Sequence, residues 1–196
     1  MNDTELLKRY AAGEEDAFQE LVSQYKDSIY AFLRRFLSQS DLVEDVFQET
    51  FLQLYISRDT YDQSRPLRPW LFTIAANKAK DALRRMQRID SANLGSMFDS
   101  DEHSIDDVLD TLDSDTRMPY DDLVKDETAT SVKRVISRMP AKLREILILA
   151  YFHKFSYAEI AGMLRIPVGT VKSRLHTAVG RFAEDWNASL LCETAN

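Results

Sequence analysis

Apolar side chains recur every three or four residues along most of this chain, which is the spacing of one face of an α-helix. In the first half, this pattern predicts helices over residues 3–12, 14–37, 41–55 and 69–88. The pattern is lost from residue 89 to about residue 120 and resumes at Asp121, after which Pro140 is placed to begin a further helix. Long helical patterns, with only five glycines and five prolines among 196 residues, predict an all-α fold.

The stretch without helical periodicity divides the chain into two parts. It is acidic and serine-rich, and its scattered apolar side chains are too few to form a core. We therefore expect two small helical domains, at residues 1–90 and 121–186, joined by an acidic flexible linker over residues 91–120. Residues 187–196 are expected to form a tail. The linker either contributes solubility or imitates nucleic acid in a basic channel, and its composition fits both roles.

The most specific local pattern is a pair of short helices that meet at a sharp break. Ser156 is placed to cap the first helix, and Glu159 three residues later completes a capping box. The break falls around Pro167, which lacks an N–H and biases Ile166 away from helical angles. A second helix then begins at about Val168. This arrangement is typical of a helix-turn-helix.

The second helix of this pair has one apolar and one basic side. The apolar side is predicted to carry Val171, Leu175, Ala178, Val179 and Phe182. The other side has hydroxyls and cations and no carboxylate: Thr170, Lys172, Ser173, Arg174, His176, Thr177 and Arg181. Side chains of these types reach phosphates and base edges in a DNA major groove. The sequence thus predicts a DNA-reading helix, and the alternative is a helical hairpin with a solvated basic face.

Charge is strongly segregated along the chain, although the net charge of −7 gives no indication of nucleic-acid binding. The net charges of the successive segments are −7 for residues 1–64, +6 for 65–88, −11 for 89–130, +8 for 131–182 and −3 for the remainder. Two basic blocks separated by an acidic one are typical of a protein that contacts a polyanion at two places.

The helix over residues 69–88 lies in the first basic block and has an unusual polar face. The residues on and beside this face are Trp70, Asn77, Lys80, Arg84, Arg85 and Arg88. An exposed tryptophan stacks on an unpaired base, asparagine bonds base edges, and arginines hold phosphates, so the face predicts binding of an opened or single strand. The alternative is that Trp70 packs against the preceding loop. In that loop, Tyr61 and Asp62 are either recognition residues or ordinary turn residues.

The helix over residues 41–55 carries a mixed face opposite its apolar one. This face holds Asp45, Gln48, Glu49 and Leu52. A leucine among acidic and amide side chains fits docking onto a basic protein surface, with the leucine as the apolar anchor. The alternative is an ordinary solvated face.

The sequence offers no pattern for catalysis, so we expect a protein that is not an enzyme and has no cofactor or metal. Its three histidines lack cysteines or paired carboxylates at ligand spacing, and no glycine-rich phosphate loop is present. Cys192 is the single cysteine, which suits a reducing cytoplasm. No apolar run is long enough to span a membrane, so we expect no direct membrane insertion. Because no catalytic pattern is present, we also expect no small-molecule substrate.

Taken together, these stretches resemble the extracytoplasmic-function (ECF, group IV) sigma factors of bacterial RNA polymerase over nearly the whole length. DLVEDVFQETFLQLY is similar to the family's helix that binds core polymerase, and RPWLFTIAANKAKDALRR to its −10 element helix. The string PVGTVKSRLH is similar to its −35-reading helix. The resemblance implies a promoter-specificity subunit with sigma region 2 at residues 1–90 and region 4 at residues 121–186.

The resemblance also implies a role for each polar surface. Asp45, Gln48 and Glu49, with Leu52, would meet the clamp coiled coil of the largest polymerase subunit. The −10 strand would be held by Tyr61, Asp62, Trp70, Asn77, Lys80, Arg84, Arg85 and Arg88. The −35 groove would be read by Thr170, Lys172, Ser173, Arg174, His176 and Arg181. An anti-sigma partner is implied as well, so the chain is expected in the cytoplasm or held at the membrane through that partner.

Three positions depart from the family pattern. Arg165 stands where the family usually has glycine, so the turn is either strained or not left-handed. Thr177 and Val179 stand where basic residues are common, which predicts a different −35 preference. Two other classes remain as alternatives: a stand-alone helix-turn-helix regulator, which would leave Trp70 and Asn77 without a role, and a helical adaptor that binds only protein.

Overall fold

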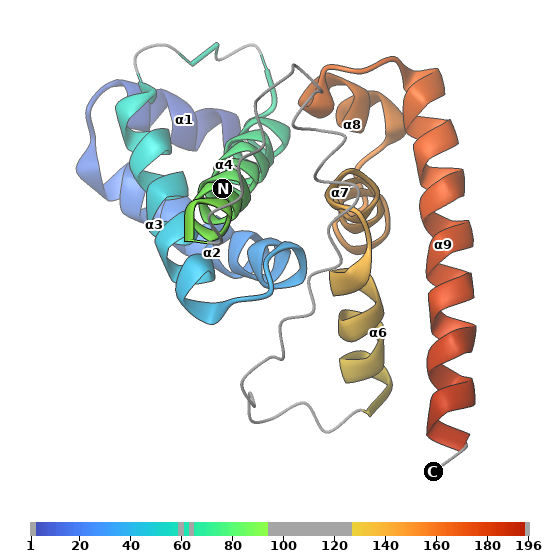
Figure 1. Cartoon of the computed structure of the whole chain (residues 1–196). Coiled ribbons are helices and arrows are strands. Elements are labelled where there is room, and N and C mark those ends of the chain that lie inside the picture. Colours follow the sequence, from blue (N-terminus) through green and yellow to red (C-terminus); the bar gives the residue numbers. More distant parts are fainter. Residues whose placement is uncertain (1–2, 59–60, 63–64, 94–126, 195–196) are drawn as a thin grey trace.

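A computed structural model describes residues 3–58, 61–62, 65–93 and 127–194, and within these ranges every regular element is a helix (Figure 1). This confirms the predicted all-α fold. The N-terminal unit comprises α1 (Asp3–Ala11), α2 (Glu15–Phe36), α3 (Ser40–Ile56) and α4 (Leu67–Asn93). The C-terminal unit comprises α6 (Glu127–Arg138), α7 (Ala141–Leu147), the π-helical turn η2 (Ile148–Phe152), α8 (Tyr157–Leu164) and α9 (Val168–Thr194). The predicted linker lies outside the described residues except for its first three, which belong to α4.

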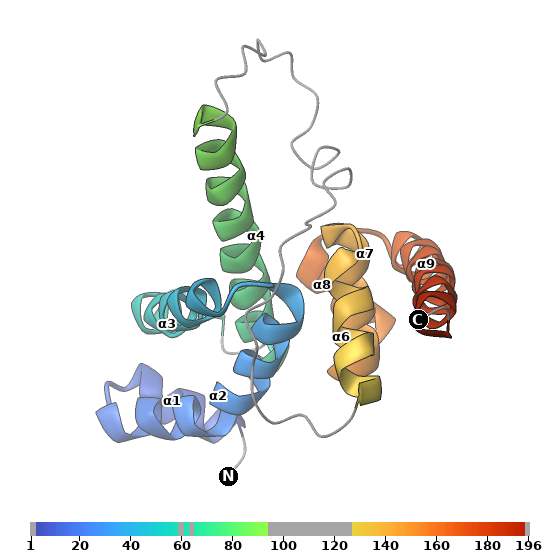
Figure 2. The same cartoon turned by 60° about the horizontal axis from the view of Figure 1, so that its bottom comes forward.

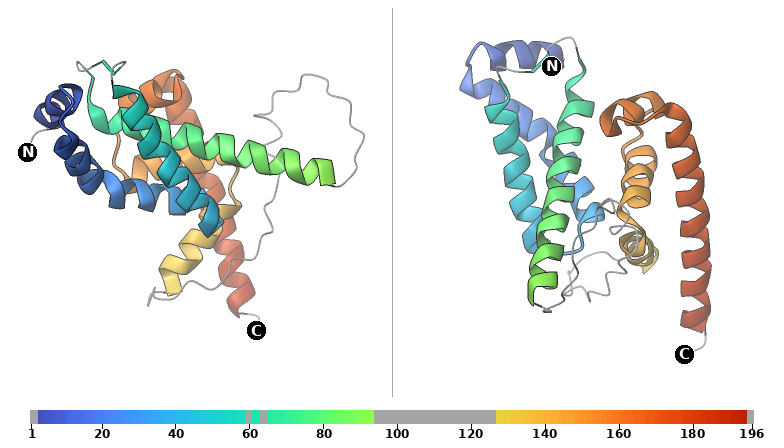
Figure 3. Two further views of the ribbon diagram at one scale, coloured as in Figure 1. Left: turned by 90° about the vertical axis from the view of Figure 1, so that its left-hand side faces the viewer. Right: turned by 45° about the horizontal axis from the view of Figure 1, so that its top comes forward.

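The N-terminal unit is built on the apolar stripes that the periodicity predicted. Along α2, the buried residues include Leu21, Ile29 and Phe36, spaced as one helical face requires. The inward side of α3 packs against α2 and α4, and it includes the buried Thr50, whose hydroxyl donates to the backbone oxygen of Val46 at 2.7 Å. That bond satisfies a buried polar group within its own helix. The second half of α4 extends beyond the rest of this unit (Figure 3).

The C-terminal unit packs α7 and α8 against α9, with α6 lying along the second half of α9 (Figure 1). Pro140 does not lie in the first turn of α7 but directly precedes it as the N-cap. At its other end, α7 widens into the π-helical turn η2, a change of pitch that the apolar periodicity did not predict. In the segment that follows, His153 and Phe155 pack against Phe72 of the N-terminal unit and are buried, while Lys154 between them is exposed.

Two predictions about α9 were wrong. Residues 187–194, expected to form a tail, continue α9, which packs on α6. Just before them, the ring of Phe182 stacks on that of Trp186, with ring centres 6.0 Å apart. Val179 was placed on the apolar side of α9 but is 40% exposed, since the packed stripe runs through Val171, Leu175 and Ala178 instead.

The two units are not separate bodies in this structure. The buried apolar residues form one continuous core that runs from α1 to α9. Contact between the units is made by α2 and α4 on one side and by α6, α7, η2 and α8 on the other. The views in Figures 1 and 2 show α9 on the side of the C-terminal unit that faces away from the N-terminal unit. The predicted −35 and −10 surfaces therefore lie on different sides of the molecule.

Candidate nucleic-acid and protein interfaces

The predicted helix-turn-helix is formed by α8, the following turn and the start of α9. Ser156 and Glu159 make both bonds of the capping box: the Ser156 hydroxyl accepts from the Glu159 N–H at 3.3 Å, and the Glu159 carboxylate accepts from the Ser156 N–H at 2.8 Å. Arg165 ends α8 in the left-handed conformation, with φ 55° and ψ 43°. This answers the question left open by the sequence, since the turn has the glycine-type geometry although an arginine occupies it.

The start of α9 presents the predicted polar side to solvent. Lys172, Ser173 and His176 are exposed, and Thr170 and Arg174 are partly exposed, while Val171 between them is fully buried. The hydroxyls are also used locally, because Ser173 donates to the backbone oxygen of Thr170 at 3.1 Å. A row of cations with no carboxylate beside it on this first half of the helix is suited to a phosphate-lined groove.

Farther along α9, the polar side changes character. Arg181 forms an ion pair with Asp185 at 3.1 Å. Its guanidinium is therefore drawn toward the C-terminal half of α9, away from the polar side chains at the start of the helix. Thr177 is exposed, and its hydroxyl donates to the backbone oxygen of Ser173 at 3.1 Å. The structure thus brings five of the six predicted −35 residues together at the start of α9 and places Arg181 at the edge of that group.

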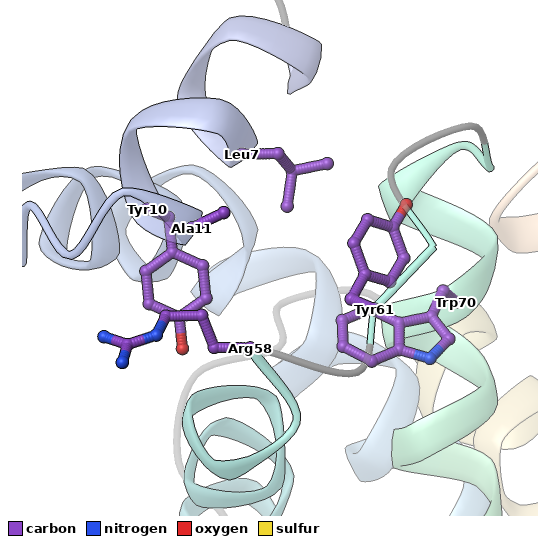
Figure 4. Close-up of a pocket in the computed structure, with 6 residues that line it drawn as sticks. All are labelled: Leu7, Tyr10, Ala11, Arg58, Tyr61 and Trp70. Carbon is purple, nitrogen blue, oxygen red and sulfur yellow. The ribbon is translucent and has the colours of Figure 1, made fainter.

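Trp70 begins the predicted −10 face, but it is not an exposed ring. Its ring lies 4.2 Å from that of Tyr61, centre to centre, and both side chains are partly buried (Figure 4). Leu7 and Tyr10 of α1 line the same small pocket. Of the two alternatives for Trp70, the structure therefore shows the ring packed against the preceding loop. Burial raises the pKa of Tyr61, with the neighbouring Asp62 adding to the effect.

The polar and basic residues of α4 point in three directions. Asn77 and Arg88 are exposed on the middle of the predicted face, and Arg84 beside them pairs with Asp81 at 3.1 Å. On one flank, Arg85 pairs with Glu49 of α3 at 3.2 Å. On the other flank, Lys80 pairs with Glu145 of α7 at 3.1 Å. The tertiary structure thus draws Lys80 and Arg85 out of the group with which the sequence placed them.

The predicted protein-binding residues of α3 line a groove against α4. This groove has a volume of about 690 Å³, and its walls are formed by Leu42, Asp45, Gln48, Glu49, Leu52, Ala82, Arg85, Met86 and Ile89. Leu52 and Ile89 are 58% and 60% exposed, so the groove presents apolar side chains of both helices to solvent. The groove combines apolar side chains from both helices with acidic and amide residues on α3, as expected of a protein-docking surface.

Sequence reasoning missed the charged residues that lie between the two units. Arg144 and Glu145 are both buried on α7, and His153 is buried after η2. Burial lowers the pKa of Arg144 to about 10 and is the largest cause of a pKa of about 4 for His153, with Arg35 and Arg68 contributing. The available signal was a pair of adjacent charged residues in the otherwise apolar segment from Leu143 to Leu149.

Metal and membrane sites were also sought in the part of the chain that the structure describes. There, no group of three or more histidine, cysteine or acidic side chains could hold a metal ion. None of the helices in the same ranges is long and apolar enough to cross a membrane.

Comparison with known proteins connects these surfaces to a family. The family model described as Sigma-70 region 2 matches residues 21–89, which span most of α2 through most of α4. The family model described as Sigma-70, region 4 matches residues 129–181, which span α6 through the first half of α9. The two matches therefore fall one on each structural unit.

Individual relatives match over nearly their whole length. The ECF RNA polymerase sigma factor SigW of Bacillus subtilis is 32% identical over 87% of this chain and 89% of its own. The RNA polymerase sigma-H factor of Pseudomonas aeruginosa is 31% identical over 90% of this chain and 89% of its own. The fold is shared with the sigma factor RpoE, solved in complex with the anti-sigma factor NepR from Bartonella quintana (TM-score 0.66, 24% identity, 87% of this chain and 96% of that one). This chain belongs to the ECF sigma factors of bacterial RNA polymerase.

Proposed function

We propose that this chain is a promoter-specificity subunit that carries no catalytic site of its own and directs core RNA polymerase to a defined set of promoters. The observation that carries this proposal is the presence, in one chain, of a helix-turn-helix with a basic helix and a separate α4 surface with an apolar, acidic groove beside it. A stand-alone regulator needs the first feature only. A sigma factor needs all three, since it contacts duplex DNA, a melted strand and polymerase.

We assign −35 recognition to the start of α9. Thr170, Lys172, Ser173, Arg174 and His176 would enter the major groove, with Arg181 reaching a flanking phosphate. Arginine and lysine there supply bidentate or point-charge contacts to bases and phosphates. Thr177 and Val179 stand on the same exposed stretch without charge, so the affinity for this element would depend on fewer phosphate contacts.

We assign −10 strand capture to the exposed face of α4 and to the loop before it. Asn77 would bond the edge of an unpaired base, and Arg84 and Arg88 would hold phosphates along the strand. The rings of Tyr61 and Trp70 already pack against each other, tilted by 38°, so they would present one joint aromatic surface to a base rather than two separate rings. Asp62, Lys80 and Arg85 complete the set, although the last two first have to release carboxylates of the protein.

We assign core binding to the groove between α3 and α4. Leu52 would insert as the apolar anchor, while Asp45, Gln48 and Glu49 would meet basic residues of the polymerase clamp coiled coil. The same surfaces are candidates for an anti-sigma factor, since covering them would block both partners. Such a chain acts where polymerase is, in the cytoplasm, and an anti-sigma factor would decide whether it is retained at the membrane.

Run-off transcription tests the whole assignment. Purified chain is added to core polymerase that lacks sigma, with a pool of promoter fragments, and the transcript start sites are sequenced. We expect defined starts that share −35 and −10 motifs, with output lowered about tenfold by Asn77→Ala or Arg174→Ala, because each removes one specific contact. Glu184→Ala, an exposed change farther along α9, is the matched control and should leave output unchanged.

The core interface is tested separately. Leu52→Asp should abolish co-purification with core polymerase, because it replaces the apolar anchor with a charge. If the chain neither binds core nor yields defined starts, yet binds duplex DNA alone, the sigma assignment is wrong and the stand-alone regulator is correct.

A further inference from the structure

The helix α8 has a cation in a strained backbone conformation at each of its ends. Among the residues that the structure describes, only two other than glycine have a positive φ: Lys154 at 57° and Arg165 at 55°. Lys154 lies just before Ser156, which caps α8, and Arg165 is the residue at which α8 ends. A Cβ atom makes the left-handed conformation unfavourable, so both positions favour glycine.

Contacts within the fold do not explain either cation. Both side chains are exposed, so burial does not offset the strain. In the described ranges, neither the ammonium group of Lys154 nor the guanidinium of Arg165 has a hydrogen bond or an ion pair. Glu159, the acidic residue of α8, is bonded to Ser156, and the sequence has no further acidic residue before Glu184. Uncompensated strain of this kind is a reason to look for a ligand outside the chain.

The position of α8 indicates what that ligand is. The helix leads directly into α9, which carries the side chains assigned to the −35 groove (Figure 1). In a helix-turn-helix, the second helix enters the major groove while the first crosses the sugar–phosphate backbone. The ends of α8 therefore lie beside phosphates, with Arg165 on the side of α9 and Lys154 on the other side. The eight residues of α8 span about 12 Å, which separates the two cations enough to bind different phosphates.

The side of α9 assigned to DNA leaves room for such contacts. Lys172 and Arg174 are the permanent cations at its start, while Arg181 farther along is held by an ion pair. Thr177 and Val179 are exposed and uncharged. Two more cations next to this surface would supply phosphate contacts that α9 itself does not provide.

We propose that Lys154 and Arg165 bind two phosphates of the −35 element, one at each end of α8. The inference rests on the proposed function and adds two residues to the set assigned to this element. Phosphate contacts fix the position and orientation of a protein on the duplex but carry no base information. The two cations therefore set the affinity for the −35 element and hold α9 in register, while the polar side chains of α9 select the bases.

The test measures promoter binding as a function of salt concentration. Polymerase is assembled with the full-length chain, and the probes are fluorescent duplex promoters selected in the run-off experiment. Lys154→Gly and Arg165→Gly should each lower the affinity by about threefold. Each should also reduce the slope of log affinity against log salt by about 1. The double variant should reduce this slope by about 2, because the two contacts are independent.

The control variants separate charge from backbone effects. Lys154→Arg and Arg165→Lys keep both the cation and the Cβ atom, so they should retain the affinity and the salt slope of the wild type. Arg138→Gln removes an exposed cation at the end of α6 and corrects for the change in net charge. The two glycine variants should raise Tm, followed by circular dichroism, while they weaken binding. A variant that weakened binding by unfolding the unit would lower Tm instead.

The outcomes distinguish this inference from the proposed function. If promoters are selected but the glycine variants keep the wild-type salt slope, or Arg138→Gln reduces it equally, the two cations do not bind phosphates. A changed −35 motif with an unchanged slope would also overturn the inference, because it would show base contacts. If no promoter is selected, the sigma assignment fails. The same variants are then tested for binding of the chain alone to duplexes of random sequence, and an unchanged slope or no binding overturns the inference as well.

Discussion

At the scale of single residues, the most informative positions are those whose type does not match their conformation or burial. Arg165 adopts the left-handed conformation, in which a Cβ atom causes steric strain. Its side chain is exposed, so burial of the side chain does not offset this strain. Leu52 is a large apolar side chain in solvent, which suits a docking anchor. Trp70 shows the opposite mismatch, because a ring expected in solvent is packed against Tyr61.

Arg165→Gly should stabilise the C-terminal unit by about 1 kcal/mol, because glycine adopts φ near 55° without a clash of its side chain. Thermal unfolding followed by circular dichroism measures the change as a rise in Tm. Arg165→Ala is the matched control: it removes the same charged chain and keeps the Cβ, so it should leave Tm nearly unchanged. Equal stabilisation by both variants would show that the guanidinium, not the backbone, is the source of strain.

At the scale of elements, α4 and α9 each combine several tasks along one helix. The first half of α9 carries the polar side assigned to DNA. Its second half lies along α6, and there the ring of Phe182 stacks on that of Trp186. The face of α4 between its two flanks remains exposed, while Arg85 is held by α3 and Lys80 by α7. Neighbouring helices therefore decide which side chains of each helix are available to a partner.

Trp186→Ala should destabilise the C-terminal unit by about 2 kcal/mol, since it removes a partly buried aromatic side chain and its stacking on Phe182. Urea unfolding measures this loss. Asn187→Ala, an exposed change one residue farther on, should have little effect. If Trp186→Ala also leaves stability unchanged, then residues 187–194 are a tail as the sequence suggested, and the contact with α6 contributes nothing.

At the scale of the whole molecule, the decisive feature is that the core continues from one unit into the other. His153 lies at the centre of that contact, between Phe32 and Phe72, and its Nε2 atom has no hydrogen-bond partner in the described part of the chain. Arg35 and Arg68 face it from α2 and α4 and oppose its protonation. Burial in this contact, the largest cause, and these two cations together lower the pKa of His153 to about 4, so the imidazole is neutral near pH 7.

Stability should consequently fall as this histidine is forced to take up a proton. Its pKa is about 4 in the folded chain against 6.5 for a free side chain, so below pH 6.5 the unfolded state binds more protons. The free energy of unfolding should then decrease by on the order of 2 kcal/mol between pH 6.5 and about 4 from this group alone.

The measurement is urea unfolding of the wild type and of His153→Phe across this pH range. Carboxylates titrate in both proteins, so the difference between the two isolates the histidine. The two curves should run parallel between pH 7 and 8, where the imidazole is neutral in both states, and diverge below pH 6.5. Curves that stay parallel down to pH 4 would mean that His153 titrates freely and is not enclosed by the contact.

Most of the helices, the helix-turn-helix and the family were predictable from the amino-acid order, because each depends on local rules. The periodicity of apolar residues places the helices. Ser156 and Glu159 mark the start of α8 through bonds to each other, and Pro167, which lacks an N–H, marks the break after it. The alternation of polar and apolar positions also assigned the exposed polar side at the start of α9, apart from Val179.

Which of the assigned side chains are available to a partner depends on how the helices pack together, and no local pattern shows it. Lys80, Arg84 and Arg85 are equivalent cations in a helical pattern, and no local rule shows that the first is held by α7 and the last by α3. Trp70 is packed rather than exposed because Tyr61 of the preceding loop lies against its ring. These outcomes depend on residues far apart in the chain, such as Lys80 and Glu145, whose meeting is set by the packing of whole helices. The local pattern thus names the candidates for binding, and the contact between the two units determines which of them the free chain presents.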